Sequence, residues 1–412
     1  MANDQSVSKL DIITTSFLVG GTCIGGGMLG LPVGSSLSGF FPSTLMLLVC
    51  WVFMTISGLL ILEVNLWMDK GAHIITMASK MLGPWGKGFA WVLYLFIGYA
   101  SLVAYMAGGG GQINQLMELA LGARPEKWIG CLVFAVGAGS VIFFGGKLVG
   151  RVNTILFTAM IASYGILVFL GSSEIKFDLL ARKDWGRSMF SIPILLTAFS
   201  FQTIVPSLTP VLNGNAKWLR FSIVFGTTIS LCVYLLWQAI VLGTVPMDGP
   251  HGLAEAYVEG NPATCCLVYT AESAWLSSIA GFFAFFALVT SFLGIALGLF
   301  DFLADGLKIE KKGLGNVALG LLVAVPSLYF AISYSRAFLV AMEISGGFGD
   351  AILNGIMPVM MIWVGRYRKG LQSEYRCPGG KPLLVLVFLF YLFVCGLEFW
   401  EQIGGLHFYS AD

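Results

Sequence analysis

Charged residues are scarce in this sequence. Only 11% of its 412 residues are Asp, Glu, Lys or Arg, whereas 57% are hydrophobic. A soluble domain carries about a quarter charged residues, so this composition excludes an ordinary soluble protein and predicts an all-α polytopic membrane protein. A net charge of +1, without a basic patch interleaved with aromatic residues, gives no support for nucleic acid as a partner.

The residue patterns of metal, redox and catalytic sites are also absent. The eight cysteines include no CxxC pair, and His73, His251 and His407 fall in predicted loops or tails without metal-ligand spacing. Neither HExxH nor GxSxG occurs, and the glycine run at 20–32 lacks the GK[ST] ending of a phosphate loop. We therefore expect no enzyme activity, no metal and no cofactor, and an ATP-driven pump is disfavoured.

Long apolar stretches dominate what remains. About 20 apolar residues cross the hydrocarbon core of a bilayer. Eleven stretches qualify, at 11–38, 41–68, 86–117, 127–145, 153–171, 189–212, 218–243, 272–303, 314–332, 345–365 and 382–403. Arg336 and Glu343 lie between the ninth and tenth stretches. The longest polar connection, 246–271, is short, so we expect no soluble domain.

The basic residues predict the orientation of these spans. Cytoplasmic loops carry an excess of Lys and Arg. If the N-terminus is cytoplasmic, 16 of the 23 basic residues fall on the cytoplasmic side. The N-terminal residues lack the basic region and cleavage pattern of a signal peptide, so the first span is expected to be retained. We predict a cytoplasmic N-terminus and a periplasmic C-terminus.

Glycine and proline interrupt the first span between Gly20 and Pro32, in the stretch GGTCIGGGMLGLP. Each interior glycine costs a helix about 1 kcal/mol relative to alanine. A helix broken inside the membrane is tolerated where protein or water satisfies the freed backbone groups, as in a substrate or ion site. The alternative is close packing, because Gly21 with Gly25 and Gly26 with Gly30 have the spacing of a helix-packing face.

The sixth span is interrupted as well. It contains Pro193, Pro206 and Pro210, with FSFQT at 199–203 near its middle. Pro206 disfavours helical geometry at the residue before it, Val205. Five spans separate the starts of the two broken spans, and an odd number inverts the second set relative to the first. The pattern is typical of a transporter with an inverted repeat and a site between the two breaks.

Four motifs in order resemble a known family. GTCIGGGMLGLPV at 21–33, ILEVNLWM at 61–68, FSFQTIVPSL at 199–208 and TSFLGIALGLFDFLAD at 290–305 resemble the bacterial hydroxy and aromatic amino acid permeases, nearest to those for tyrosine and tryptophan. The resemblance implies the five-plus-five inverted-repeat (LeuT-like) fold of the amino acid–polyamine–organocation superfamily, with repeats at 1–171 and 189–365 and an added helix at 382–403.

The resemblance also implies a function. It implies import of tyrosine or tryptophan across the bacterial inner membrane by proton symport. A sodium-coupled transporter of another neutral amino acid is the alternative. The partners would be an aromatic amino acid, H⁺ in preference to Na⁺, and membrane lipid around an expected monomer. The family pattern has a His where this chain has Gln202, which puts proton handling and substrate choice in question.

The expected substrate site combines the two breaks with the third span. Backbone N–H groups at a helix start suit a carboxylate, and a polar run flanked by Phe suits an aromatic zwitterion. A wall of glycines in the third span would leave room for a ring, although it would serve close packing equally well. The candidates are Thr22, Cys23, Gly25, Gly26, Gly27, Tyr105, Gly108, Phe199, Ser200, Phe201 and Gln202.

Three residues are candidates for ion coupling. Glu63 is a carboxyl inside a predicted span and could take and release a proton, or it could have a fixed structural partner. Thr290 and Ser291, in the middle of the eighth span, could help to hold sodium with first-span carbonyls. Their alternative role is a hydrogen bond to the preceding helical turn. A channel remains a rival function, although no ring of charges or selectivity-filter motif is present.

Overall fold

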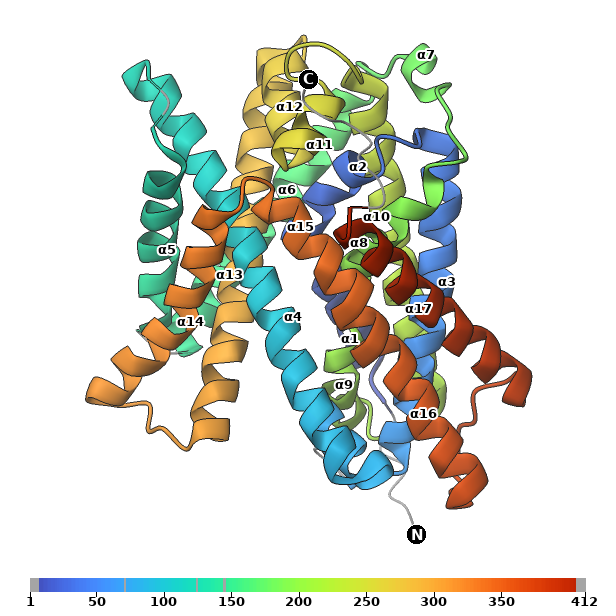
Figure 1. The fold of residues 1–412 in the computed structure, drawn as a ribbon. Coiled ribbons are helices and arrows are strands. Elements are labelled where there is room, and N and C mark those ends of the chain that lie inside the picture. Colours follow the sequence, from blue (N-terminus) through green and yellow to red (C-terminus); the bar gives the residue numbers. More distant parts are fainter. Residues whose placement is uncertain (1–6, 70–71, 124, 144–145, 405–412) are drawn as a thin grey trace.

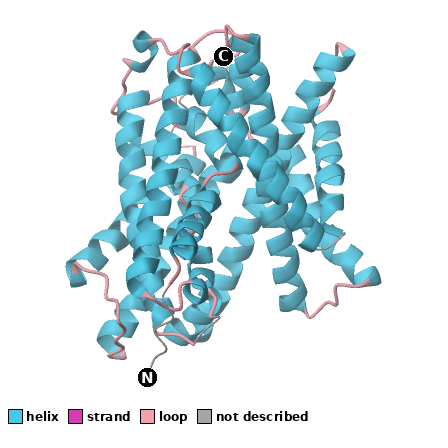
Figure 2. Cartoon of the chain, turned by 180° about the vertical axis from the view of Figure 1, so that it is seen from behind, coloured by secondary structure: helices cyan, strands magenta, loops and turns pink. Residues whose placement is uncertain are grey.

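The protein is a bundle of helices. The computed structural model describes residues 7–69, 72–123, 125–143 and 146–404, and every regular element within these ranges is helical (Figure 1). The cartoon in Figure 2 shows the same helices from behind, joined by short loops. Helices α5 (Lys127–Phe143) and α14 (Gly313–Ser333) lie on one side of the bundle, and α3 (Phe40–Leu66) lies on the other, in both views.

Nine helical segments in the described ranges are long and apolar enough to cross a membrane. Seven of them are single helices: α3, α4 (Ile74–Leu121), α6 (Gly146–Gly171), α10 (Ala216–Thr244), α13 (Ala274–Leu307), α14 and α17 (Gly380–Gln402). The eighth segment joins η2 (Ser188–Ser191), α8 (Ile192–Ala198), η3 (Gln202–Ile204) and α9 (Val205–Val211). The ninth joins α15 (Ala337–Ile344), η4 (Ser345–Ile356), α16 (Met357–Trp363) and η5 (Val364–Arg368). The expectation of a polytopic all-helical membrane protein is confirmed.

The first and fourth predicted spans differ from simple long helices. The first is a bent pair, α1 (Lys9–Cys23) and the stretch η1 (Gly26–Gly30) with α2 (Leu31–Gly34), which meet at 43°. Counting this pair as one span brings the total over the described residues to ten. The fourth, α5, has 17 described residues, which is at the lower end of the length that crosses a bilayer.

The first break lies at Ile24 and Gly25. Both residues are extended, and Gly25 has φ −170° and ψ −157°. A short 3₁₀ helix starts at Gly26 and passes into α2 at Leu31, with Pro32 in the first turn, where its missing N–H costs nothing. The predicted interruption of the first span is therefore confirmed, and the glycines lie at its turning point.

The second break lies earlier than the proline pattern predicted. Helix α8 ends at Ala198, and Phe199 to Phe201 separate it from the next helical turn. Val205 has helical angles, φ −51° and ψ −42°, and begins α9 with Pro206 in its first turn. The prediction that Pro206 pushes Val205 out of helical geometry is wrong, because proline is well accommodated at a helix start.

Two predicted boundaries also move. The tenth span begins at Ala337 instead of 345, because Glu343 is buried in the helix with its carboxylate 4.0 Å from the Arg336 guanidinium. Residues Ser345–Ile356 of this span form a π-helix, a rare geometry that is frequently found at functional sites. The third span extends to Ile74, with a kink at Gly83, whose φ is +77°.

Helix α10 lies against the first broken span and against α3. Gly226 of α10 is the closest point of its crossing with α1, since a Cβ there would lie 2.5 Å from the Ser16 carbonyl oxygen and 2.7 Å from Cβ of Val19. The predicted polar connection at 246–271 forms α11 (Leu253–Glu259) and α12 (Ala263–Thr270), which pack against α2. The second half of the first broken span is thus enclosed.

The crossing of α1 and α10 gives a test of this packing. We expect Gly226→Val to lower the free energy of unfolding by about 1–3 kcal/mol, because the new side chain meets backbone that cannot move. Gly165→Val is the matched control, since no atom lies within 4 Å of the Cβ position at Gly165. Thermal unfolding in detergent measures both. Equal melting temperatures for the two variants would contradict the close approach.

Candidate functional site

One hydroxyl group joins the two broken spans. Tyr234 of α10 is fully buried, and its Oη lies 2.6 Å from the carbonyl oxygen of Cys23 and 2.7 Å from that of Ala198. Cys23 and Ala198 are the last residues of α1 and α8. Because a tyrosine hydroxyl has a single hydrogen, it donates to one carbonyl at a time. The carboxyl ends of the two half-helices therefore converge on one point.

The same helix holds the second half of the first span. The Trp237 indole N–H donates to the Met28 carbonyl at 2.8 Å. The amide of the next residue, Gln238, is 2.7 Å from the hydroxyls of both Ser35 and Ser43. Tyr234, Trp237 and Gln238 are all buried, so these bonds link α10 to the broken span and to the start of α3 where water does not reach.

The opposite side of the first break meets α13 and α4. The Gly26 N–H donates to Oγ of Ser291 at 2.7 Å. A Cβ at Gly26 would lie only 2.8 Å from the Tyr105 ring, and a Cβ at Gly25 would collide with Oγ of Ser291. The glycines thus let two other spans approach the backbone itself. Gly25, Tyr105 and Ser291 are each partly exposed.

Phe199 and Ser200 lie at the second break. The Phe199 ring packs edge-on against Tyr234, with ring centroids 5.1 Å apart. The Ser200 hydroxyl donates to Oδ1 of Asp350, in η4, at 2.5 Å. Ser200 is partly exposed, whereas Asp350 is completely buried. Five expected site residues around the two breaks, together with Tyr105 and Ser291, are thus gathered near Tyr234: Cys23, Gly25, Gly26, Phe199 and Ser200.

Phe201 and Gln202 face α3 instead. The Phe201 ring packs where a Cβ of Gly58 would be. The Gln202 amide donates to the Met54 carbonyl at 3.1 Å, and its oxygen accepts from the Phe201 N–H at 3.0 Å. Both side chains are fully buried. In this structure they fix the second break to α3 and present no free polar group to the space between the breaks.

Other candidates form local contacts. The Thr22 and Thr290 hydroxyls donate at 2.8 Å to carbonyls of the preceding turn, Leu18 and Phe286. A Cβ at Gly27 would touch Met342. A Cβ at Gly108 would lie 3.1 Å from both Leu288 and Phe338, so this glycine serves close packing of α4 in the structure.

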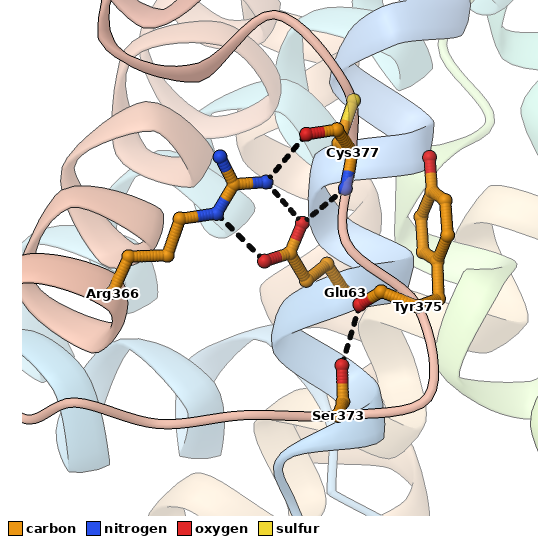
Figure 3. Close-up of polar contacts among 5 residues, drawn as sticks. All are labelled: Glu63, Arg366, Ser373, Tyr375 and Cys377. Carbon is orange, nitrogen blue, oxygen red and sulfur yellow. Dashed lines mark hydrogen bonds and ion pairs between the residues drawn. The ribbon is translucent and has the colours of Figure 1, made fainter.

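Glu63 lies away from the breaks, near the end of α3, in a buried ion pair (Figure 3). Its carboxylate accepts from Arg366 Nε at 2.7 Å and Nη2 at 2.5 Å, and from the Cys377 N–H at 2.7 Å. Arg366 also donates to the Cys377 carbonyl at 2.8 Å. Burial raises the pKa of the Cys377 thiol, which therefore adds no second negative charge. This arrangement favours a structural role for Glu63.

Comparison with known proteins agrees with this architecture. The model of the tryptophan/tyrosine permease family matches residues 8–398. The chain belongs to this family. The tyrosine-specific transport system 1 of Haemophilus influenzae is 32% identical over 96% of this chain and 98% of its own length. The tryptophan-specific transport protein of Pseudomonas aeruginosa is 31% identical over 91% of each chain, and the low affinity tryptophan permease of Escherichia coli K12 is 26% identical over 94% and 95%.

Family membership confirms the predicted resemblance and identifies the chain as a permease, a transport protein and not an enzyme. The matches extend over nearly the whole permease, so they agree with a multi-pass inner membrane protein.

Several residues of the permease site were not predicted from its sequence. Tyr234 reads as an ordinary aromatic residue of an apolar helix, and no local pattern signals its role. Asp350 did carry a signal, because it is an acidic residue within the predicted tenth span, and such residues are functional candidates by default. Arg366 lies just beyond the tenth predicted stretch, 345–365, and the structure places it at the end of a span with its side chain buried against α3.

The Glu63–Arg366 pair gives a second test. Removing one partner of a buried ion pair leaves the other charge uncompensated, so we expect Glu63→Gln or Arg366→Gln to cost the permease about 3–5 kcal/mol of stability. The double variant should lose less stability than the sum of the losses in the two single variants. Thermal unfolding of the four proteins measures the coupling. Strictly additive losses would mean that the two side chains do not depend on each other.

Proposed function

We propose that the permease imports tyrosine, tryptophan or both across the bacterial inner membrane by proton symport and alternating access. The observation that carries the proposal is the meeting of the two breaks at Tyr234. The converging carbonyl ends carry partial negative charge suited to an ammonium group, and the helix start after the first break suits a carboxylate. The Tyr105 ring adds partly exposed aromatic surface beside the first break, and the buried Phe199 ring packs against Tyr234 at the second. The printed names of the relatives, tyrosine- and tryptophan-specific, support this substrate class.

The proposed architecture is eleven transmembrane helices in two inverted repeats, 1–171 and 189–365, with the helix at 382–403 added. Breaks in the first and sixth spans, each starting a set of five, support the repeat. In this proposal α5 counts as the fourth helix, and α1 with α2 counts as the first. The excess of Lys and Arg in alternate loops supports a cytoplasmic N-terminus and a periplasmic C-terminus.

A sodium-coupled transporter of another neutral amino acid is the second candidate. The Ser291 hydroxyl lies at the first break, next to Gly25 and Gly26, which is where first-span carbonyls and an eighth-span hydroxyl would hold the ion. Thr290 donates its hydroxyl hydrogen to the Phe286 carbonyl, and its oxygen lone pairs could still face an ion. The proton is the preferred coupling ion because the family resemblance implies proton symport.

Uptake of labelled tyrosine and tryptophan into cells without their own aromatic permeases tests the proposed function. We expect saturable accumulation that a protonophore abolishes and that does not require sodium, because a symporter draws on the proton gradient. Accumulation that requires sodium would make sodium, instead of the proton, the coupling ion. Saturable equilibration without accumulation would contradict active transport.

The first break gives a sharper test of the site. A leucine at Gly25 would collide with Ser291, so we expect Gly25→Leu to lower uptake by at least about tenfold, equivalent to about 1.4 kcal/mol. Gly281→Leu on α13 is the matched control, since no atom lies within 4 Å of its Cβ position. Uptake is compared at equal abundance in the membrane. Unchanged uptake by Gly25→Leu would remove this break from the transport site.

A further inference from the structure

Asp350 is a carboxyl group held inside the membrane-spanning part of the protein. It is 0% exposed and lies in the π-helix η4, which packs against α8, α4, α3 and α17. Oδ1 accepts from the Ser200 hydroxyl at 2.5 Å and from the Asn354 amide at 2.6 Å. Its other oxygen, Oδ2, is also buried and has no hydrogen-bond partner. One half of this carboxyl is therefore fixed and the other half is free.

Within the ranges that the structure describes, no positive charge compensates this carboxyl. Among the described residues, no Lys or Arg forms an ion pair with Asp350. Tyr105 of α4 and Tyr391 of α17 are close enough to interact electrostatically with it, and both carry neutral hydroxyls. Helix α8 has no titratable side chain.

Other buried acids lie on the neighbouring helices. Glu398 of α17 packs at Gly347, nearer the α15 end of the π-helix. Its Oε1 accepts from Gln402, and its Oε2, like Oδ2 of Asp350, is buried without a hydrogen-bond partner. Glu343 of α15 is 4.0 Å from Arg336. On the other side, Glu63 of α3 and Arg366 of η5 neutralise each other. Asp350 differs from Glu398 in its direct hydrogen bond to the second break, through the Ser200 hydroxyl.

An isolated carboxylate is strongly disfavoured away from water, so such a group is neutralised by a proton or another cation. A proton adds to a lone pair of Oδ2 and needs no additional space. A sodium ion or a substrate ammonium would need several oxygen ligands around an accessible atom, whereas Oδ2 is out of reach of solvent. Ser200 lies between the carboxyl and the partly exposed break.

We propose that Asp350 is the group that carries the coupling proton in this permease. This inference rests on the proposed proton symport. In each cycle a proton from the outer side forms an O–H bond with the carboxylate, and that bond breaks when the proton leaves to water on the inner side. A neutral amino acid and one proton cross together, so one positive charge moves with each substrate.

Ser200 provides the link between proton and substrate. A carboxylate only accepts hydrogen bonds, whereas a carboxylic acid also donates one. When Oδ2 takes the proton, Oδ1 still accepts from the Ser200 hydroxyl but loses its negative charge, so the hydrogen bond that holds Ser200 becomes weaker. Asn354, which donates to Oδ1 at 2.6 Å and lies 3.2 Å from the Ser200 hydroxyl, holds this geometry. Such a link makes proton binding and substrate binding reciprocal.

The test uses the purified full-length permease in liposomes. Accumulation of labelled tyrosine or tryptophan is driven by an imposed pH gradient, and exchange of internal for external substrate is measured without a gradient. We expect Asp350→Asn to reduce gradient-driven accumulation by at least about tenfold, the usual size of a coupling between two ligands, while exchange stays within about twofold. The exchange rate of this variant should also lose its dependence on pH.

Glu398→Gln is the matched control, because it makes the same change at a buried carboxyl on the neighbouring helix. We expect it to accumulate substrate like the unaltered permease. Equal loss of accumulation in both variants, or full accumulation by Asp350→Asn, would overturn the assignment. Loss of exchange and of substrate binding in Asp350→Asn would make the carboxyl an anchor for the substrate ammonium instead. Sodium stimulation that disappears in this variant would make it a sodium ligand.

Two further measurements separate a failure of the Asp350 assignment from a failure of proton symport and from misfolding of the variant. If the unaltered permease shows no response to the pH gradient, the proposed proton symport fails, and the role of Asp350 fails with it. If Asp350→Asn is not recovered as a folded protein, Ser200→Ala tests the same group, because it keeps the carboxyl and removes one donor. We expect Ser200→Ala to shift the pH at which exchange is half-maximal. An unchanged pH profile would overturn the assignment.

Discussion

The fold depends on satisfying backbone groups where two helices are broken inside an apolar bundle. Lipid offers no hydrogen bonds, so each freed carbonyl or N–H must find a partner within the protein. Helix α10 supplies partners for both breaks, through Tyr234 at Cys23 and Ala198, and through Trp237 at Met28. Ser291 supplies one from the other side, at Gly26. These side chains supply hydrogen-bond partners at the points where the two helices are interrupted.

The same partners that stabilise the breaks also position them for function. Because Tyr234 has one hydrogen and two carbonyl acceptors, one acceptor is always left for another donor. A substrate ammonium has the charge and the hydrogen atoms for that place. The structural requirement and the proposed binding chemistry are therefore met by one group of atoms.

Two buried acids show how the environment determines the role of a residue type. Glu63 has a bidentate arginine and a backbone N–H, so its charge is compensated, and it ties η5 and the connection after it to α3. Asp350 has only neutral donors on one oxygen and none on the other. Both residues look alike in an apolar sequence. A fixed ion pair suits a structural role, whereas an uncompensated carboxyl suits a role in which the carboxyl gains and loses a proton.

The sequence by itself determined the class of protein, most of its helices and the two breaks, because hydropathy and the glycine and proline pattern act within single segments. Its motifs also determined the family. Sequence could not predict that Gln202 faces α3, that Arg366 reaches Glu63, or that Asp350 meets Ser200. These contacts join residues more than a hundred positions apart. Only the packing of the helices decides which side chains meet, and in a low-dielectric interior that meeting decides which charges are compensated.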